Sequence, residues 1–337
     1  MQSAPPSVGP RAWRVNRAAD GRAAGHVGEL GWDPAADPGA GTAVVAVEAA
    51  GFNYKDALAC AGHPGVMRSS PLVPGIDLAG RLLRAAAGLP AGAAVVVTGN
   101  GLGETRDGGF ATHARVPDGA VLPRPAGLSG ADAMALGTAG LTALAACSRL
   151  AALASDPGGD WLVTGASGGV GMLAVARLAE AGCRVVACSR KPAARQPLLA
   201  LGAAEVAAPD GVVAPPGKSL AKGRWAGVID TVGGPLLADV LRSVRGGGVV
   251  AAIGMAGGAE LPTTVHPFIL RGVTLVGIDA ATQLSQADRR LLWGELAAFW
   301  PRVRGRLPLT TLGLADIDAW AGRMLRGETV GRGVVVP

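Results

Sequence analysis

Apolar residues in the second half of the chain form short runs that alternate with stretches of helical spacing. Residues 160–164 and 184–188 are apolar runs of strand length. Between them, residues 170–181 show helical spacing and end at Gly182, a common helix stop. A second helix is expected over 192–201. This alternation predicts a parallel sheet covered by helices on both faces. Further strands of this sheet are expected at 227–230, 248–253 and 274–278.

The first third of the chain shows a different pattern. Strand-like runs at 42–50, 78–83 and 94–98 are separated by segments rich in Pro and Gly. They predict a β-rich domain with many loops. Residues 1–30 carry little pattern, and the tip of the chain is expected to be loose.

The C-terminal segment, residues 285–337, predicts a helix rich in Arg, Leu and Trp and then a strand at 333–336. A terminal strand needs a partner, and the β-rich first domain is the natural place. The fold class is therefore α/β, with a doubly wound parallel sheet and a second, β-rich domain. The division expected is a discontinuous first domain, residues 1–130 and 280–337, around a second domain at 131–279.

Composition narrows the function classes. The 337 residues are 49% hydrophobic and 17% charged, with a formal net charge of +6 and no block of basic residues. We therefore expect neither disorder nor a nucleic-acid partner. The N-terminus has no secretory pattern, and no long uninterrupted apolar run predicts a membrane span. Four scattered Cys fit a reducing cytoplasm better than a disulfide framework.

A glycine-rich segment, Gly165-Ala-Ser-Gly-Gly-Val-Gly171, follows the predicted strand at 160–164 and opens the predicted helix. Backbone N–H groups at such a helix start can hold a pyrophosphate, and the helix dipole favours its charge. Glycines let the loop turn tightly and approach the ligand. The segment predicts a dinucleotide site, although a plain turn between strand and helix is the alternative.

The residues after the second strand indicate which dinucleotide binds. An NAD site usually has an acidic residue there for the ribose 2′-hydroxyl. This chain has Ser189-Arg190-Lys191 instead. One hydroxyl and two cations suit a 2′-phosphate, so NADPH is favoured over NADH. The alternative is that Arg190 and Lys191 are only the solvated start of a helix.

A metal site is not expected. Zinc needs three or four Cys, His or carboxylate ligands from defined places. No Cys cluster suits a structural site, and no matching Cys and His pair suits a catalytic one. His63, after Gly62, is the histidine that most resembles a ligand, but no partner set accompanies it. We interpret His26, His113 and His266 as surface or loop residues.

Several blocks resemble one known family. The segments concerned are 53–57 (NYKDA), 73–80 (VPGIDLAG), 137–143 (GTAGLTA), 163–171, 229–233 (IDTVG) and 261–271 with its LPTTV and PFILR blocks. Together they resemble the acryloyl-CoA reductase branch of the quinone oxidoreductase-like family, which belongs to the zinc-independent medium-chain dehydrogenases/reductases. The resemblance covers roughly residues 42–337 in order.

The resemblance implies a GroES-like catalytic domain, a Rossmann domain that binds NADPH, no zinc and a homodimer. It implies reduction of an α,β-unsaturated acyl thioester such as acryloyl-CoA. It places cofactor contacts at Tyr54, Ser167, Gly168, Gly169, Val170, Ser189, Arg190, Thr231, Leu275 and Arg332. We add Thr138, from one of the resembling blocks, and Lys191, from its charge.

Two residues are expected at the reacting atoms. Tyr54 is the only Tyr in the chain, and its hydroxyl could bond the nicotinamide or the substrate, or supply a proton. Asn53 could orient the substrate carbonyl. Asp77 is interpreted as structural. The alternative for Tyr54 is an aromatic that only packs its loop.

Three other functions stay open. One is a quinone or enone reductase that uses the same cofactor. Another is a tailoring enoyl reductase for a carrier-protein-bound intermediate, and the third is a non-catalytic NADPH-binding protein. Fold alone does not separate them.

Overall fold

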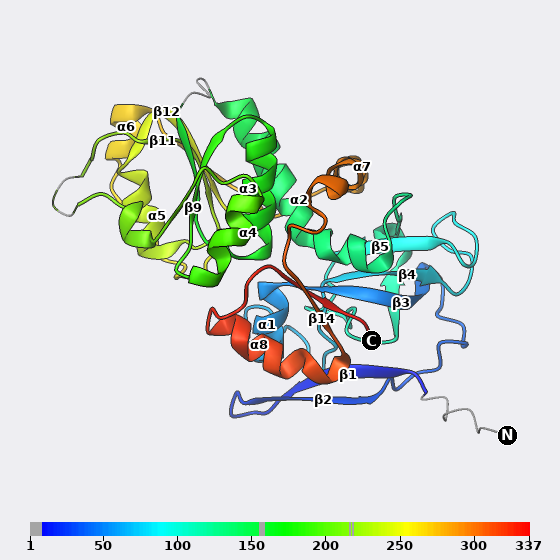
Figure 1. Ribbon diagram of the computed structural model, residues 1–337. Helices are drawn as coiled ribbons and strands as arrows, with labels where there is room; N and C mark the ends of the chain where they lie inside the picture. The colour runs from blue at the N-terminus through cyan, green and yellow to red at the C-terminus, as the bar shows by residue number, and fades with distance from the viewer. Residues whose placement is uncertain (1–8, 155–158, 216, 218) are drawn as a thin grey trace.

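The computed structural model describes residues 9–154, 159–215, 217 and 219–337. Figure 1 shows two lobes, with the C-terminus in the lower one. The upper lobe holds a six-stranded sheet in the order β10-β9-β8-β11-β12-β13, and all its neighbouring strands are parallel. This is the order 3-2-1-4-5-6 of a doubly wound dinucleotide fold. The strands are β8 (Asp160–Val163), β9 (Arg184–Cys188), β10 (Glu205–Ala207), β11 (Trp225–Asp230), β12 (Val244–Ala252) and β13 (Thr274–Gly277).

Both faces of this sheet are covered, which confirms the prediction. Trp161 and Val163 of β8 pack in one apolar cluster with α3 (Gly169–Glu180) and α4 (Arg195–Ala200). Leu162 points to the opposite face and packs in a second cluster with α5 (Gly234–Leu241). Successive strand residues thus reach opposite cores, as the two-residue period requires. Helix α6 (His266–Arg271) precedes the edge strand β13.

The lower lobe contains a seven-stranded sheet. Its main path is β14-β15-β3-β4-β5-β7, and β6 pairs with β3. The C-terminal strand β15 runs antiparallel to β3, with Gly333 opposite Phe52. The expected pairing of the chain's end with its beginning is therefore confirmed. The strands are β3 (Thr42–Phe52), β4 (Asp77–Leu82), β5 (Ala94–Thr98), β6 (His113–Pro117), β7 (Leu122–Pro123), β14 (Leu309–Leu312) and β15 (Arg332–Val335).

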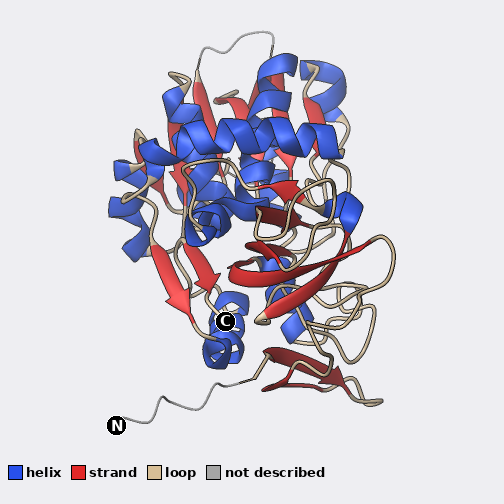
Figure 2. Ribbon diagram, turned by 90° about the vertical axis from the view of Figure 1, so that its right-hand side faces the viewer, coloured by secondary structure: helices blue, strands red, loops and turns tan. Residues whose placement is uncertain are grey.

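Residues 11–29 correct one expectation. They form a two-stranded antiparallel sheet of β1 (Arg11–Arg17) and β2 (Ala23–Glu29), visible at the base of both views (Figures 1 and 2). Trp13 and Val15 are buried in the core of the lower lobe. The expected loose tip, residues 1–8, lies outside the described residues.

A long helix that the sequence analysis missed joins the two lobes. Helix α2 (Gly130–Leu153) packs against β3 and β4 of the lower sheet and against α3 and α7 (Gln286–Val303). It is long and apolar enough to cross a membrane by length and composition, but two thirds of that window (67%) is buried inside the protein. Such burial is what a core helix of a two-domain fold would show.

Helix α2 is broken at Gly137, whose φ of 49° and ψ of −150° are not helical. The residue thus divides α2 into two helical segments. The sequence analysis had assigned α1 (Tyr54–Cys60) to a loop. The remaining helices are also short: α8 (Ile317–Leu325) and the single turns η1 (Asp118–Ala120), η2 (Pro192–Ala194), η3 (Pro209–Gly211) and η4 (Leu314–Asp316).

Candidate functional site

The fold predicts a ligand crevice where the order of the parallel strands reverses, between β8 and β11. Ligands of open parallel sheets bind outside the carboxyl ends of the strands at such a point. Buried hydrogen bonds tie the two strand ends together: Thr164 Oγ1 donates to Asp230 Oδ1 (2.5 Å), and Thr231 Oγ1 donates to the Thr164 carbonyl (2.9 Å). Thr231, a predicted cofactor contact, therefore lies at the carboxyl ends of these two strands.

The predicted glycine loop forms the next wall. Gly165 has a φ of 58°, in the left-handed region that favours glycine. Gly168 is the N-cap of α3, so the first N–H groups of that helix are free to meet an anion. A Cβ on Gly169 would lie 2.4 Å from Arg332 Cδ, so only glycine fits there. Ser167 is buried, whereas Gly168 and Val170 are half-buried.

Ser189, Arg190 and Lys191 follow β9, next to the crevice, as predicted. Ser189 Oγ accepts the Lys191 backbone N–H (3.1 Å), which closes a tight turn. The Arg190 side chain is exposed, whereas Lys191 is half-buried. Burial, and then the neighbouring charge of Arg190, lower the pKa of Lys191. This turn carries two cations and a hydroxyl, the groups that bind a phosphate.

A buried charge cluster lies behind the glycine loop. Asp77 Oδ2 accepts the Thr138 backbone N–H (2.7 Å), and Asp77 Oδ1 accepts the Thr138 hydroxyl (2.5 Å). The break at Gly137 frees that N–H, so Asp77 caps the second segment of α2. A Cβ on Gly137 would lie 2.5 Å from Asp77 Oδ2, which excludes larger residues.

Arg332 caps the other side of the break. Its Nε and Nη2 donate to the carbonyls of Ala135 and Met134 (3.0 Å each), at the end of the first segment of α2. Its Nη1 donates to the Phe52 carbonyl and to Asn53 Oδ1 (3.0 Å each). Arg332 is only 3% exposed. A cation at the C-terminal end and an anion at the N-terminal end each match the helix dipole.

Asp56 completes this arrangement at the start of α1. Its Oδ1 accepts the N–H groups of Gly75 (3.1 Å) and Ile76 (2.8 Å). Its Oδ2 accepts the Asn53 backbone N–H (2.7 Å) and side-chain amide (3.2 Å). Burial, and then the charge of Asp77, raise the pKa of Asp56 to about 7, although these hydrogen bonds oppose the shift.

Arg289 brings a fourth buried charge to the same place. Its Nη1 donates to Thr98 Oγ1 (3.0 Å), and Thr98 pairs with Asp77 across β4 and β5. Its Nη2 donates to the Ala281 carbonyl (2.7 Å). Two aspartates of the first lobe thus face two arginines from the C-terminal part of the chain. We name Asp56, Asp77, Arg289 and Arg332 the buried charge cluster.

Three predicted site residues already contact other parts of the protein: Asn53, Arg332 and Leu275. The side-chain amide nitrogen of Asn53 donates to Asp56 and to Asp77 (2.9 Å), and its oxygen accepts from Arg332. Its polar atoms are thus already engaged, so a substrate would have to displace a protein partner. The Arg332 guanidinium is engaged in the same way and lies behind the glycine loop. Leu275 is half-buried and packs against the core of the second lobe.

Tyr54 is different, because 38% of its surface is exposed. It is the first residue of α1 and directly follows Asn53, which the charge cluster holds in place. The adjacent Lys55 donates from Nζ to Glu104 Oε1 (3.1 Å). Burial opposes ionisation of Asp279, but hydrogen bonds from Thr282 and then the charge of Lys55 outweigh it and lower the pKa of Asp279. Tyr54 therefore has an accessible phenol on a firmly held turn.

The sequence analysis missed Asp56 and Arg289. A signal for Asp56 was available: Asn53 followed three residues later by an acid is the spacing of a helix N-cap box. No local pattern marks Arg289, because its partners come from distant segments. The contacts of Asp77 with Thr138 and Asn53 fit the structural role expected for it, and the residue begins β4.

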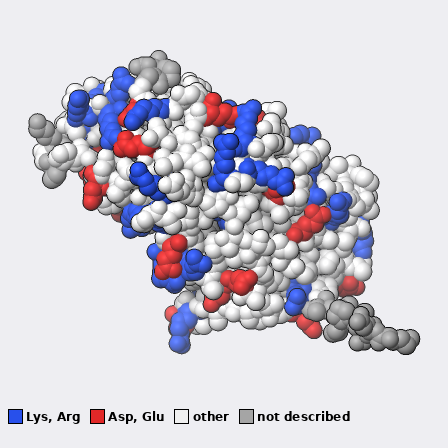
Figure 3. All heavy atoms as spheres, in the orientation of Figure 1, with Lys and Arg blue, Asp and Glu red and all other residues white. Residues whose placement is uncertain are grey.

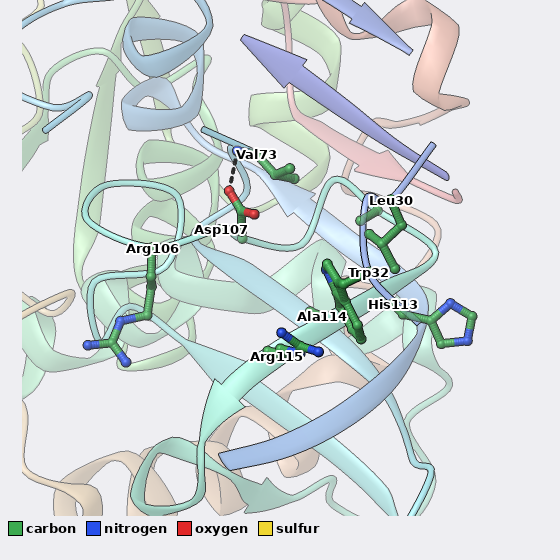
Figure 4. A pocket seen from close by; sticks show the side chains of 10 residues that line it. Leu30, Trp32, Val73, Arg106, Asp107, His113, Ala114 and Arg115 are labelled. Atoms are coloured by element: carbon green, nitrogen blue, oxygen red, sulfur yellow. Dashed lines mark hydrogen bonds between the residues drawn. The ribbon is translucent and has the colours of Figure 1, made fainter. Parts of the chain in front are cut away.

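Two hollows of about 230 Å³ each lie apart from these residues. The one in Figure 4 is lined by residues such as Trp32, Asp107 and Arg115, with the Arg115 guanidinium 4.2 Å from the centre of the Trp32 ring. No predicted site residue lines either hollow. Across the described residues, no group of three or more His, Cys, Asp or Glu could hold a metal ion.

Comparison with known proteins agrees with this two-domain organisation. Residues 39–126 match the alcohol dehydrogenase GroES-like domain, and residues 169–296 match the zinc-binding dehydrogenase domain. The chain is 41% identical over 297 residues to acrylyl-CoA reductase AcuI of Ruegeria pomeroyi, covering 88% of this chain and 90% of that protein. It is 40% identical to the probable acrylyl-CoA reductase AcuI of Escherichia coli, covering 88% and 91%.

Solved structures give the same result. The YhdH oxidoreductase of Salmonella enterica in complex with NADP superposes with a TM-score of 0.87 at 38% identity, covering 97% of this chain and 99% of that one. Bacillus subtilis YhfP with NAD bound also gives 0.87, at 34% identity, covering 98% and 100%. With a GroES-like domain, a Rossmann domain and relatives of this identity over most of its length, the chain belongs to the medium-chain dehydrogenase/reductase family.

Proposed function

We propose that this protein is an NADPH-dependent reductase of the C=C bond of an α,β-unsaturated acyl thioester of the acryloyl-CoA type. The observation that carries the cofactor assignment is the cationic turn Ser189-Arg190-Lys191 after β9, where an NAD site would have an acid. The two acrylyl-CoA reductase relatives support the substrate class. The division into domains at 1–130 with 280–337, and at 131–279, is kept as part of this proposal.

The residues of the crevice fit the cofactor. The N–H groups at the start of α3 would bind the pyrophosphate, and Arg190 and Lys191 would bind the 2′-phosphate. When bound, NADPH supplies the hydride. The chain itself has to hold the thioester and stabilise the negative charge that develops on its carbonyl oxygen. The Tyr54 hydroxyl is our candidate donor on the first lobe, and we assign Asn53 and Arg332 to positioning it.

The direct test is a spectrophotometric screen of NADPH oxidation with acryloyl-CoA, crotonyl-CoA, a quinone and a simple enone. We expect the highest kcat/KM with acryloyl-CoA. A quinone reductase is the second candidate, because a putative quinone oxidoreductase of B. subtilis is 43% identical over 70% of this chain. Preference for the quinone would replace the proposal, and NADPH binding without turnover of any of them would indicate a non-catalytic protein.

Tyr54→Phe tests the role of the phenol. The substitution removes the hydroxyl and keeps the ring, so packing should survive. We expect a fall of about tenfold, mostly in the KM for NADPH, as for a positioning hydrogen bond. A fall above about a hundredfold in kcat would instead indicate proton donation. If Tyr54→Phe matches wild type while Tyr54→Ala loses thermal stability, Tyr54 is only a packing residue.

Zinc independence remains a prediction, and the family description makes it worth testing. Elemental analysis of the purified protein should find no stoichiometric zinc. Incubation with a chelator should leave NADPH-dependent turnover intact. Loss of turnover on chelation, restored by added zinc, would show a ligand set that we have not identified.

We further propose a homodimer formed by the outer edge of the second lobe. Strand β13 is the last strand of its sheet, so one side of it is unpaired. Large apolar side chains are exposed on α6 and the loops before it. They are Met255 (66%), Val265 (62%), Ile269 (73%) and Leu270 (64%). An exposed apolar patch beside an open sheet edge is typical of a subunit interface.

Light scattering after gel filtration tests the dimer. We expect the wild type to elute at twice the chain mass and Ile269→Asp/Leu270→Asp at the mass of one chain, because two charges would be buried in the interface. The matched control is Leu291→Asp, at an equally exposed leucine on α7 (69%). A monomeric wild type would contradict the proposal.

The remaining expectations concern environment and partners. All four cysteines are free, and Cys60, Cys147 and Cys188 are buried. We propose a cytoplasmic location on that basis and a small thioester as the only ligand besides the cofactor. Figure 3 shows Lys and Arg in several small groups with acidic residues among them, so this face offers no continuous basic surface for a nucleic acid.

A further inference from the structure

A five-residue segment of the first lobe lies against the dinucleotide loop of the second. Residues 327–331 (Gly-Glu-Thr-Val-Gly) connect α8 to β15, and we name them the strap. In Figure 1 the chain leaving α8 (red) rises toward the upper lobe before it returns as β15. The strap begins and ends at glycines with positive φ, 74° at Gly327 and 79° at Gly331.

The far end of the strap is bonded to the pyrophosphate-binding loop. The Gly331 N–H donates to the Ser167 carbonyl (2.9 Å), and Gly331 forms a parallel bridge with Gly168, the N-cap of α3. The next residue, Arg332, packs against Gly169 and belongs to the buried charge cluster. The position of the strap is therefore coupled to both the cofactor loop and the turn that carries Tyr54.

The middle of the strap is bonded to the predicted 2′-phosphate site. Lys191 Nζ donates to the Thr329 carbonyl (2.5 Å). Thr329 is only 7% exposed. Arg190 is close by, because a Cβ on Gly327 would lie 3.5 Å from its Nη2. The Lys191 side chain thus bonds from the second lobe to the strap of the first, whereas the Arg190 side chain is exposed.

Lys191 has no ion-pair partner among the residues that the structure describes. Through the described ranges, no carboxylate forms an ion pair with Lys191 or Arg190, whereas Glu328 of the strap pairs with Arg326 (2.8 Å). A half-buried ammonium beside a second cation is unfavourable, and its pKa is accordingly lowered. A dianionic phosphate between the two side chains would supply the missing charge and would leave an ammonium proton free for Thr329, since Lys has three donors.

We propose, on the basis of the proposed NADPH site, that Lys191 is a positioning residue that couples recognition of the 2′-phosphate to the strap. A bound phosphate fixes the ammonium, the ammonium fixes the Thr329 carbonyl, and the strap then holds the glycine loop and the Tyr54 turn in one arrangement. NADH carries the same pyrophosphate but lacks the 2′-phosphate, so it does not fix the Lys191 ammonium or, through it, the middle of the strap. Lys191 therefore contributes to turnover as well as to affinity, whereas Arg190 contributes to affinity alone.

Hydrogen exchange of the strap tests this directly, because it needs no substrate. Amide exchange of peptides covering 327–331 is followed in the wild type alone, with saturating NADPH, with saturating NADH and with 2′,5′-ADP. The variants are Lys191→Met, Arg190→Met and a remote control, Lys222→Met, which removes an exposed lysine of the same lobe. We expect NADPH and 2′,5′-ADP, but not NADH, to slow exchange about tenfold in the wild type.

The variants Arg190→Met and Lys191→Met should then differ in strap exchange and in kcat. At saturating NADPH, Arg190→Met should keep the slowed exchange and most of kcat, whereas Lys191→Met should lose the slowing and about tenfold in kcat. If Lys191→Met shows wild-type slowing and kcat at saturation, Lys191 is an ordinary phosphate contact and the coupling is wrong. Failure of the wild type to bind NADPH at all would instead overturn the proposed function.

Discussion

Replacing Arg332 with Met is expected to lower the free energy of unfolding by about 3–5 kcal/mol, the usual result of removing one partner of a buried charge set. The guanidinium is 3% exposed and donates to three carbonyls and to Asn53. Met fills much of the space but leaves these acceptors without donors and leaves Asp56 and Asp77 with less opposing charge. Urea unfolding followed by tryptophan fluorescence would measure the change.

Two further variants serve as controls for Arg332→Met. Arg22→Met removes an exposed arginine that pairs with Asp20, two residues away, and should change stability little. Arg332→Lys keeps the charge but cannot match the forked geometry, so an intermediate loss is expected. A loss below about 1 kcal/mol for Arg332→Met would mean that the charge cluster contributes little to the stability of the fold.

The Rossmann lobe could be predicted largely from local patterns. Five of its six strands contain a short apolar run, and β9 was predicted with its exact ends, Arg184–Cys188. The edge strand β10 (Glu205–Ala207) was missed, because it has only three residues and none of them is fully buried. The glycine loop is equally local, because it joins one strand to the following helix. These features depend on neighbouring residues, so a single sequence contains the information.

The charge cluster could not be predicted in this way. Arg332 donates to the carbonyl of Phe52, 280 residues earlier in the chain, and no spacing rule connects such positions. Helix α2 was missed for another reason: its many Ala and Gly residues give a weak helical pattern, and the break at Gly137 depends on Asp77 and Arg332. Strand β2 was missed because it has no buried residue and so lacks an apolar pattern. Strand β1 has three buried residues, but they lie between Arg and Asn residues in a single short segment.

Replacing Arg190 with Ala is expected to weaken NADPH binding by about 1.5–3 kcal/mol, roughly 10- to 150-fold in Kd, and to leave NADH binding nearly unchanged. The physical reason is that Arg190 would meet only the 2′-phosphate, which NADH lacks. Its side chain is exposed after β9, with no carboxylate among the described residues paired to it. Burial is therefore not a large part of its contribution.

Fluorescence titration of both cofactors with the wild type and Arg190→Ala measures this difference, since the chain has seven Trp. The wild type should prefer NADPH clearly, and the variant should lose most of that preference while its melting temperature stays unchanged. Thermal melts matter here because a misfolded variant would weaken both cofactors alike. Equal affinities of the wild type for NADPH and NADH would contradict the cofactor assignment. The NADH titration is needed because the solved structure of B. subtilis YhfP contains NAD. Selective loss of NADPH in the variant would identify the turn after β9 as the site where the chain distinguishes the two cofactors.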